Sequence, residues 1–559
     1  MQKRVRDKVR AIVGRNIEVD LIDRRHFIQK AALLAAGSAF GSSLMGCGYE
    51  QPIPCLGPAP PPTPIPGTTY IRASEIGCAL DCNLENGRNK YNGGAATDDG
   101  PRINAAMAGA SASNPITLII DGSALVSGLF LPAGGYWSIA GLGCGTGFFI
   151  KKRTNNDGIH NGPPNAGVPS DPGPPAPARG SSVSLSNFTI NGNAGDGTDG
   201  VSTTGVRQGT SNVWYFGINL MNLDNIKIEK VVIVNTPAYH IRLSNVGNVS
   251  VSGCVMRSFG ANTDGLHFDG PANDITISNC DFRTGDDSIA LNCPEGYSGD
   301  ISRVTVTDCT VNSFSLMRLY TTFGGPAKFK INNVSVSNCN GMLAEAAFLI
   351  GLSNGSNLNS VDSLTISDCN LSAPTMLGIA ENFGTIALKN VSFTPFRESV
   401  WWLGPQVNHV SAFVRPSPPY GGITCVGSGL SFENCTIHRN SDVKVCAVIL
   451  ENNSTINTLT FDGLAMQDAG SYSPIQELLD IGSGSINQLV LNSLDSKNIK
   501  TPISQGGFSS IGIVSGTGVL ATSWEFPDAV MANNVPYISA STGQPSIKIN
   551  GVVESYTGA

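Results

Sequence analysis

One short pattern recurs along the middle of the chain: apolar and polar residues alternate, and a two-residue turn then precedes a further apolar position. Alternation with period two is typical of strands, and the pattern returns mostly every 22 to 30 residues. One such turn cannot bury its apolar side alone, so successive turns must stack around a shared core. We therefore predict an all-β fold, a right-handed parallel β-helix. The clear copies are "VSVSGC" (249–254), "ITISNC" (275–280), "VTVTDC" (304–309), "VSVSNC" (334–339), "LTISDC" (364–369) and "LSFENC" (430–435).

The last position of each copy belongs to a series that we expect to point into the core. Equivalent side chains of a parallel coil lie about 4.8 Å apart along its axis, so the members should stack. The six cysteines of the series are predicted to be buried thiols, because parallel side-chain directions disfavour a disulfide. The series, with its degenerate copies, is Phe188, Val231, Cys254, Cys280, Cys309, Cys339, Cys369, Val391, Cys435, Leu464 and Leu494.

Four other cysteines lie between residue 50 and the repeat. Cys78 and Cys82, with Cys55 or Cys144 nearby, are the better disulfide candidates. The pairing among them is left open by the sequence.

The flanks of the repeat predict how the coil ends. The segment "ATDDGPRINAAMAGA" (96–110) has the pattern of an amphipathic helix, capped by Asp98 or Asp99, which would cover the N-terminal end. The repeat domain is expected to span 68–514. Residues 515–559, where the series is lost, are expected to cap the other end.

Two steps of the series are nearly twice the usual length. The step from Phe188 to Val231 indicates a missed turn or a long excursion. The step from Val391 to Cys435 carries an aromatic, proline-rich stretch (400–422), which we expect to project as a loop.

The first 46 residues are expected to be a targeting segment rather than part of the fold. Arg24, Arg25, Phe27 and the short apolar stretch after them resemble a twin-arginine export signal. It ends in "LMGC", which resembles a lipoprotein cleavage box with Cys47 as the lipidated residue; an ordinary signal peptide cut nearby is the alternative. The proline-rich segment 47–67 would be an extended linker. The expected product is a periplasmic or cell-surface lipoprotein or a secreted protein, with membrane contact only through the lipid.

Composition restricts the partners. The net charge is −7 and charged residues are only 14% of the chain, so no basic face is available for nucleic acid. Glycine is abundant, with 65 residues, as expected for a turn-rich β protein.

Three aspartates lie beside glycines in the centre of the repeat. Asp264 belongs to "NTDG" (262–265), and Asp286 and Asp287 belong to "TGDD" (284–287), 22 residues later. Because 22 residues make about one turn, we expect the three carboxylates to meet on neighbouring turns. They could also be unrelated turn residues or a calcium site.

The alternation around these aspartates sets their direction. Leu266, Phe268, Ile289 and Leu291 occupy inward positions, so the carboxylates are expected on the outer surface, with no lysine nearby. One of them is then expected to have a raised pKa, because three like charges in one patch are unfavourable. A protonated carboxyl beside an ionised one is what hydrolysis of a glycosidic bond requires.

These motifs resemble the polygalacturonases of glycoside hydrolase family 28, which have the pectin-lyase-like β-helix. "NTPAYHIRLSNVGNVSVSGC" (235–254) is similar to the family's Asn-Ser-Pro-x-Trp-x-x-His segment. The resemblance implies that Asp286 is the general acid, and that Asp264 and Asp287 orient and deprotonate the attacking water, with inversion at the anomeric carbon. It implies a pectic or other extracellular polysaccharide as substrate, contacted by Asn262, and no cofactor.

The chain departs from the family pattern where the substrate would be held. In place of the family's Gly-His-Gly stands Ser315 or Leu316, within "FSLMRLYTT" (314–322). In place of its Arg-Ile-Lys, which grips a substrate carboxylate, stand Leu349 and Gly351.

Several residues are candidates for the lost contacts. Arg318 is a candidate to replace the cations. His240 and His267 are candidates to replace the histidine, although a surface or hydrogen-bonded structural role is the preferred interpretation of each. Trp401, Trp402 and Tyr420 are candidates for stacking on sugar rings, or for packing a loop onto the coil.

Three functions are therefore open. The register of the aspartates favours a glycoside hydrolase without a metal. A polysaccharide lyase would need Ca²⁺ on the acids and Arg318 as base. A non-catalytic β-helix that binds glycan would keep the acids as a relic or an ion site.

Overall fold

The computed structural model describes most of the chain after the expected signal. All described residues belong to one compact unit, Gln51–Glu398 with Val407–Ala559. The predicted signal segment, Cys47, Trp401, Trp402 and Tyr420 lie outside the described residues. Described are residues 53–555, except 56, 153, 155, 163–174, 195–214, 259–261, 323–327, 352–359, 396–409, 416–423, 440–444, 451–452, 469–475, 498, 500, 504–506, 520–521 and 523.

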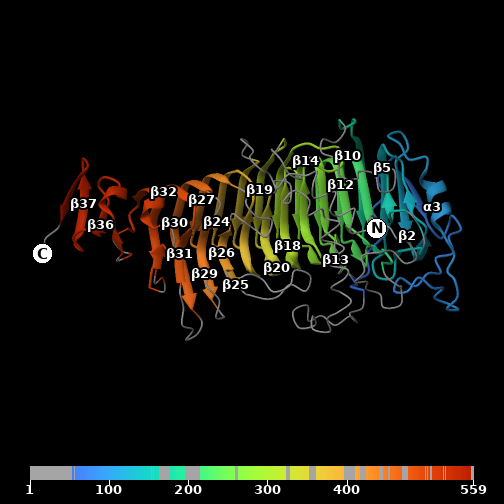
Figure 1. The fold of residues 1–559 in the computed structure, drawn as a ribbon. Helices are drawn as coiled ribbons and strands as arrows, with labels where there is room; N and C mark the ends of the chain where they lie inside the picture. The colour runs from blue at the N-terminus through green and yellow to red at the C-terminus, as the bar shows by residue number, and fades with distance from the viewer. Residues whose placement is uncertain are drawn as a thin grey trace, which may run out of the picture. The chain divides into compact units, whose positions relative to one another are not determined.

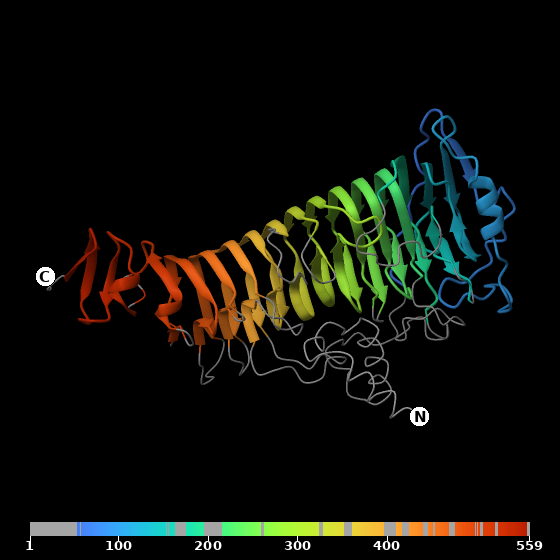
Figure 2. The ribbon, with the colours of Figure 1, turned by 45° about the horizontal axis from the view of Figure 1, so that its top comes forward.

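The described chain winds into a coil whose turns each contribute strands to three sheets (Figure 1, Figure 2). Neighbouring turns pair in parallel: Ile275 pairs with Val304 in one sheet, and Leu266 with Ile289 in another. The prediction of an all-β, right-handed parallel β-helix is confirmed. In the described part of the chain, no helix is long and apolar enough to span a bilayer.

We number the sheets in the order in which the chain visits them. The first sheet carries the recurring pattern and contains β1 (Thr69–Arg72), β2 (Ile116–Ile120), β5 (Gly135–Gly141), β8 (Gly180–Ser186), β17 (Ile301–Thr307), β19 (Ile331–Ser337), β21 (Val361–Ser367), β24 (Phe383–Lys389), β27 (Val426–Glu433), β32 (Ser485–Asp495) and β34 (Ile511–Ser515). The second contains β3 (Ser123–Val126), β6 (Gly147–Ile150), β9 (Thr189–Asn191), β11 (Val232–Val234), β13 (Val255–Ser258), β15 (Asp281–Thr284), β22 (Asn370–Ala373), β25 (Ser392–Pro395) and β28 (Thr436–Arg439).

The third sheet leads back to the first. It contains β4 (Leu129–Phe130), β7 (Ile159–His160), β16 (Asp287–Asn292), β23 (Thr375–Ile379), β26 (Val410–Arg415), β29 (Val445–Leu450), β31 (Gln476–Ile481) and β33 (Thr501–Ile503). Long strands run on from the third sheet into the first, namely β10 (Ile218–Glu229), β12 (Ile241–Ser252) and β14 (Leu266–Ser278). Others run from the second into the third, namely β18 (Thr310–Tyr320) and β20 (Asn340–Ile350), while β30 (Thr455–Asp468) joins the first and second.

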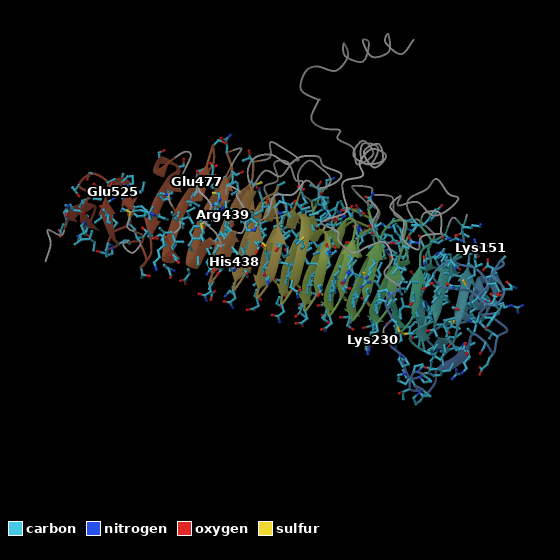
Figure 3. The ribbon with its side chains drawn as sticks, turned by 90° about the horizontal axis from the view of Figure 1, so that it is seen from below. Lys151, Lys230, His438, Arg439, Glu477 and Glu525 are labelled. Atoms are coloured by element: carbon cyan, nitrogen blue, oxygen red, sulfur yellow. A yellow bond between two sulfur atoms is a disulfide. The ribbon has the colours of Figure 1, made fainter. Side chains whose placement is uncertain are left out.

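Ten corners from the first sheet to the second pass through a residue with positive φ, just before an inward residue of the series. Asn338 has φ +52° and Asp308 has φ +56°. Asn, Asp and Gly adopt this left-handed conformation at low cost, which explains the polar letter before each cysteine. Lys230 is an exception with φ +51°, and its side chain points away from the coil (Figure 3). The corner residues are Asn187, Lys230, Gly253, Asn279, Asp308, Asn338, Asp368, Asn390, Asn434 and Gly463.

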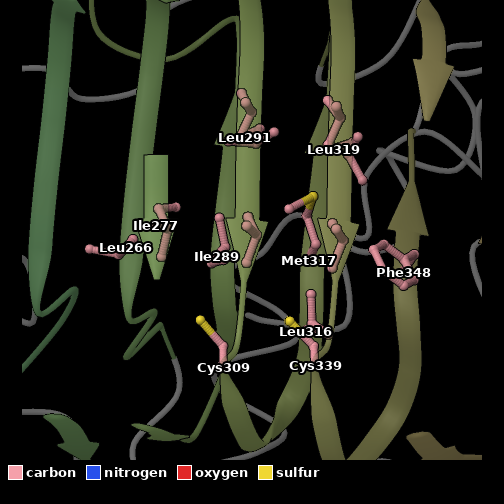
Figure 4. Close-up of a cluster of buried hydrophobic side chains, with 14 of the residues drawn as sticks. Leu266, Ile277, Ile289, Leu291, Cys309, Leu316, Met317, Leu319, Cys339 and Phe348 are labelled. Atoms are coloured by element: carbon pink, nitrogen blue, oxygen red, sulfur yellow. The ribbon is translucent and has the colours of Figure 1, made fainter. Parts of the chain in front are cut away.

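The predicted series lines the core. Ten of its eleven side chains are at most 2% exposed, and the last, Leu494, is half-buried and packs against the same core. Its six cysteines are free thiols, as predicted. Inward residues of the third sheet stack in the same way, since Leu266, Ile289, Met317 and Phe348 follow one another on successive turns (Figure 4).

One disulfide, between Cys55 and Cys144, joins the proline-rich segment to the coil among the described residues. The candidates Cys78 and Cys82 are instead buried free thiols. Cys82 packs with Leu125 and Phe149 in a small apolar cluster, so its sulfur is used for packing.

The N-terminal helix is present but shorter than predicted. Helix α3 (Gly100–Met107) packs Ile103 and Met107 into the core near the first turns. The carboxylate of Asp99 accepts the amides of Ala79 and Leu80 instead of capping the helix. Asp98 accepts the Gly100 amide at 3.1 Å.

The two long steps of the series are excursions. Val232 pairs with Thr189, so Phe188 and Val231 lie on neighbouring turns and no turn was missed. Ser392 likewise pairs with Thr436 across the second long step, which includes β26; the rest of the stretch 400–422 lies mostly outside the described residues.

After β34 the chain leaves the coil. Short 3-10 turns, η1 (Phe508–Ser510) and η3 (Asp528–Val530), flank this point, and a separate four-stranded sheet follows. Phe526, Met531 and Tyr537 of this part belong to the main apolar core. The small sheet contains β35 (Glu525–Phe526), β36 (Pro536–Ser539), β37 (Pro545–Ile549) and β38 (Val552–Ser555).

Candidate active site

The three aspartates meet at the corner where the chain enters the third sheet. The Gly265 amide donates to the Asp287 carbonyl at 2.9 Å, which places Asp264 and Asp287 on neighbouring turns. One carboxylate oxygen from each of the three aspartates lies within 4.8 Å of the others. Spacing along the sequence therefore predicted this encounter correctly. We call Asp264, Asp286 and Asp287 the aspartate cluster.

Local hydrogen bonds hold the corner in shape. The Thr284 hydroxyl donates to the carbonyls of Asp286 and Asp287, at 2.9 and 3.3 Å. The Gly285 amide donates to the Thr263 hydroxyl of the preceding turn at 3.0 Å. The threonines of "NTDG" and "TGDD" thus fix the backbone that carries the acids.

Asp287 is buried and paired with a cationic side chain. It is 1% exposed, its Oδ1 accepts the Ser315 hydroxyl at 2.6 Å, and its Oδ2 pairs with Nε of Arg318. The Arg318 guanidinium also donates to the Tyr320 hydroxyl and lies 4.8 Å from that ring. The structure therefore places Arg318, predicted to bind substrate, against Asp287.

Asp264 is buried as well, at 2% exposure, and its Oδ2 lies 2.7 Å from Nδ1 of His267. The expectation that the carboxylates all face the outer surface is thus wrong for Asp264 and Asp287. The expectation that no positive charge compensates the acidic patch is also wrong, because His267 contacts Asp264 and Arg318 contacts Asp287.

Asp286 is the most exposed member of the cluster. Its side chain is half-buried, and Oδ2 accepts the backbone amide of Asn262 at 3.1 Å. Asn262, predicted to contact substrate, has φ +57° and is 7% exposed, so it contacts the acid through its backbone.

His267 is surrounded by carboxylates. Besides Asp264, its Nε2 lies 2.8 Å from Oε2 of Glu295 and 3.2 Å from Oδ1 of Asp269. Burial alone would lower the pKa of His267, but the charge of Glu295 and the hydrogen bonds to Asp264, Asp269 and Glu295 raise it well above its usual value. The ring stacks on Tyr239, with centroids 3.8 Å apart.

His240 has a different environment. It is fully buried, and its Nδ1 donates to the backbone carbonyl of Asp264 at 2.8 Å. Burial lowers the pKa of His240 to about 4, so it is neutral at pH 7. Of the two histidine candidates, only His267 can supply a cation here.

Sequence reasoning missed Asp269 and Glu295. Asp269 stands two residues after His267, at another outward position of β14, and this periodicity could have identified it. Glu295 follows β16 in a short loop, where no periodicity applies. Its position depends on how the chain turns after Asn292.

The positions of the family's missing residues are also filled. Ser315 donates to Asp287, while Leu316 is buried in the core (Figure 4). Leu349 is buried, and a side chain built on Gly351 would collide with the Glu381 side chain at 2.1 Å. A carboxylate therefore occupies the space beside one position where the resemblance implies a cation.

Calcium fits the aspartate cluster poorly. Ca²⁺ takes six to eight oxygen ligands, about 2.3–2.6 Å away. Both oxygens of Asp287 and one of Asp264 are already bonded to Ser315, Arg318 and His267. Loading a cation here would require two ion pairs to break.

Comparison with known proteins gives a family match for the centre of the chain. Residues 179–379 match the sequence model of "Glycosyl hydrolases family 28". An exopolygalacturonase of Arabidopsis thaliana is 27% identical over 114 residues, which is 19% of this chain and 26% of that protein. The chain thus matches about a quarter of that relative's length.

Solved structures of similar architecture have low identity. The family 28 exopolygalacturonase of Yersinia enterocolitica is 11% identical, with TM-score 0.37 over 80% of this chain and 78% of that one. The α-1,3-glucanase catalytic unit of Streptomyces thermodiastaticus is 12% identical, with TM-score 0.41 over 83% and 70%. The segment that matches the glycosyl hydrolase family 28 model is the one that carries all three aspartates.

Proposed function

We propose that the protein hydrolyses glycosidic bonds at the aspartate cluster. The observation that carries this proposal is the convergence of three carboxylates, from two neighbouring turns, within 4.8 Å. Such hydrolysis needs one carboxyl that donates a proton to the leaving oxygen and one carboxylate that activates water. The family 28 match over 179–379 supports the same chemistry.

Asp286 acts as the general acid in this proposal. Asp264 and Asp287 each face a cationic partner, His267 and Arg318, and such a partner favours the ionised form of a carboxyl group. A third carboxylate close to two anions is the one on which a proton is most favourable. Asp286 is also the most exposed of the three, and thus the most accessible to a glycosidic oxygen.

Asp264 and Asp287 hold and deprotonate the attacking water, and the anomeric configuration inverts. The short separation of the carboxylates is closer to that of retaining enzymes, in which one acid attacks the sugar directly. Burial argues against direct attack, because neither Asp264 nor Asp287 exposes more than 2% of its surface. A small water molecule can reach the carboxylate oxygens of Asp264 and Asp287, whereas the anomeric carbon of a bulky sugar cannot.

The sugar at the cleavage site is proposed to be neutral. Arg318 is paired with Asp287, and Leu349 and Gly351 stand where the resemblance implies cations. Glu381 lies against Gly351, and a uronic carboxylate there would meet an anion. Like charges brought together in a poorly solvated groove weaken binding.

Export remains part of the proposal. The N-terminal segment resembles a twin-arginine signal, with Cys47 as the lipidated residue and a proline-rich linker behind it. The Cys55–Cys144 disulfide supports an oxidising compartment, because cytosolic thiols are kept reduced. A polysaccharide outside the cytoplasm is then the accessible substrate.

The decisive test is product release from a panel of glycans. Arabinan, dextran and other glucans would be compared with polygalacturonate and rhamnogalacturonan, using wild type and Asp286→Asn, each with and without EDTA. We expect new reducing ends from a neutral glycan, unaffected by EDTA, and a loss of about 100- to 10,000-fold in Asp286→Asn. Proton NMR of the first product would show the inverted anomer.

Other outcomes contradict the proposal. Cleavage that EDTA abolishes, with an unsaturated product that absorbs in the ultraviolet, would identify a lyase. Binding without cleavage across the panel would identify a glycan-binding protein. Cleavage of polygalacturonate in preference to every neutral glycan would overturn the substrate assignment alone.

A further inference from the structure

We propose that Glu295 and Asp269 hold His267 as an imidazolium, and that this imidazolium keeps the Asp264 carboxylate ionised and oriented towards the attacking water. Glu295 and Asp269 would then be positioning residues, which act on the reaction through His267. The role of Asp264 in this inference rests on the proposed hydrolase. The charge state of His267 does not depend on the proposed hydrolase activity.

The contacts of the ring require two N–H groups. Nδ1 faces Oδ2 of Asp264 at 2.7 Å, and Nε2 faces Oε2 of Glu295 at 2.8 Å. A carboxylate oxygen only accepts hydrogen bonds. In either neutral tautomer, one ring nitrogen would turn a lone pair towards a carboxylate, with both groups buried. The doubly protonated ring satisfies both contacts.

Burial makes these hydrogen bonds costly to lose. His267, Asp269 and Glu295 are at most 1% exposed, so water cannot replace a lost partner. An unpaired buried carboxylate is far more costly than an exposed one. The imidazolium gives Glu295 and Asp264 a shared counter-charge.

The remaining charges around the ring are also accounted for. Asp269 has its own cation, because its Oδ2 lies 2.5 Å from Nη2 of Arg242 and accepts Nε at 2.8 Å. Asn292 donates to Oε1 of Glu295 at 3.2 Å. The charged or titratable groups that face His267 or its partners are Asp264 and Asp269 from its own turn, Glu295 after β16, Arg242 and Tyr239 from the preceding turn, and Arg318, which is paired with Asp287.

Aromatic packing fixes the ring plane. His267 and Tyr239 stack with an interplanar angle of 6°, and Tyr239 stacks in turn on Phe216, with centroids 5.1 Å apart. The ring is therefore held where Nδ1 meets Asp264. A fixed donor orients the carboxylate, and orientation of this kind is a large part of catalytic rate.

The role in the reaction follows from the proton balance. The oxygen of water bonds to the anomeric carbon and its proton passes to Asp264 or Asp287, while Asp286 gives its proton to the leaving oxygen. Asp264 can take part only while it is ionised. A neutral His267 would remove the charge that stabilises this form.

The first measurement follows the charge state of His267 directly. Nitrogen chemical shifts of ¹⁵N-histidine distinguish an imidazolium from both neutral tautomers, and His267→Gln would assign one signal among the six histidines of the full-length protein. In wild type we expect the His267 midpoint to lie well above the usual histidine value, because the ring faces Glu295 and Asp264. Titration near the usual midpoint would overturn the inference.

Glu295→Gln then tests the residue that holds the proton. Without the Glu295 charge, the His267 midpoint should fall by about one pH unit or more. Glu381→Gln is the matched control, because Glu381 is also buried and follows a strand of the third sheet three turns further on; it should leave the His267 signal unchanged. An unchanged midpoint in Glu295→Gln would overturn the role of Glu295.

The pH profile separates positioning from general damage. As pH rises, Glu295→Gln should lose kcat/KM earlier than wild type, and the two profiles should converge at acidic pH, where His267 is protonated in both. A purely structural defect would lower the whole profile by one factor. Asp274→Asn, an exposed carboxylate paired with Arg303, should leave the profile unchanged.

Two checks keep the outcomes distinct. If Glu295→Gln does not fold, Asp269→Asn and the wild-type titration still report the charge of His267. If no glycan is cleaved but His267 remains an imidazolium, the hydrolase proposal fails and the charge assignment stands. Stoichiometric divalent metal in the purified protein, with a metal-shifted His267 signal, would overturn the inference.

Discussion

Asp287 shows how neighbouring side chains compensate a buried carboxylate. Ser315 donates to one oxygen and Arg318 pairs with the other, and Arg318 in turn lies against Tyr320. Leu349 and Gly351 stand where the resemblance implies the uronate-binding cations, and the nearby Arg318 is already paired with Asp287. Acid and arginine therefore form one unit in the site.

Removing Arg318 should leave Asp287 buried and uncompensated. We expect Arg318→Met to lower the free energy of unfolding by about 3–5 kcal/mol, the usual effect of breaking a buried ion pair from one side. The midpoint of chemical denaturation, with its slope, measures this. In Arg318→Met with Asp287→Asn most of the stability should return, because an amide needs no counter-charge, but activity should not.

Two outcomes would contradict this prediction. If Arg318→Met is as stable as wild type, Asp287 does not depend on the pair. If the double variant is less stable than Arg318→Met alone, the loss came from packing of the long side chain rather than from charge.

The sequence predicted some of these residues and missed others for physical reasons. Asp264 and the pair Asp286–Asp287 were found because a 22-residue spacing equals one turn. The burial of the Asp264 and Asp287 side chains was not predicted, because both residues stand at a corner, where strand alternation no longer applies. Glu295 was missed because it lies in a loop, and no periodic pattern in the sequence predicts where a loop residue points.

At the scale of the element, the corners that precede the inward series restrict which residue types the chain can use there. Asn338 has φ +52°, lies exposed and directly precedes buried Cys339. Its residue type is therefore selected by backbone conformation rather than by contacts. The same reasoning explains why Asn, Asp or Gly fills nearly all of these corners.

Asn338→Val should destabilise the coil by about 1–2 kcal/mol, because a β-branched residue is strained in the left-handed region. Asn338→Gly should cost less, since glycine accepts positive φ without strain. Asn340→Val, two residues later in β20 and also exposed, serves as control and should be nearly neutral. Equal losses for both valine variants, measured by denaturation midpoints, would show that the backbone angle is not the cause.

Element boundaries were the weaker part of the sequence prediction. Helix α3 covers only eight of the fifteen residues expected, and the carboxylate of Asp99 binds the backbone of Ala79 and Leu80 rather than the start of the helix. The step from Phe188 to Val231 predicted a missed turn or a long excursion without deciding between them, and the two residues lie on neighbouring turns. Periodicity shows where strands recur, but it does not show how far the chain travels between them.

At the scale of the whole molecule, one covalent link joins segments that are far apart in sequence. The Cys55–Cys144 disulfide closes a span of 89 residues around the first turns and α3. The coil itself is stabilised only by contacts between adjacent turns. The ends of such a stack are where it opens first.

Cys55→Ala with Cys144→Ala should therefore lower stability at the N-terminal end. We expect a loss of about 2–4 kcal/mol, mainly because the unfolded chain regains freedom. Native-state hydrogen exchange should show faster opening of β1 and β2 and little change around the aspartate cluster. Treatment of wild type with a reducing agent should reproduce the effect. An alkylating agent should leave the buried series thiols unmodified, since burial raises the pKa of Cys435 to about 11.

The aspartate cluster spans a single step between two turns. Duplication or loss of a whole repeat elsewhere in the gene would change the length of the coil and leave that step intact, whereas one repeat inserted between Asp264 and Asp287 would move them about 4.8 Å further apart. Length and chemistry can therefore be inherited independently. Descendants of such a chain are free to vary the extent of the surface they offer to a polymer while keeping the same two turns for cutting it.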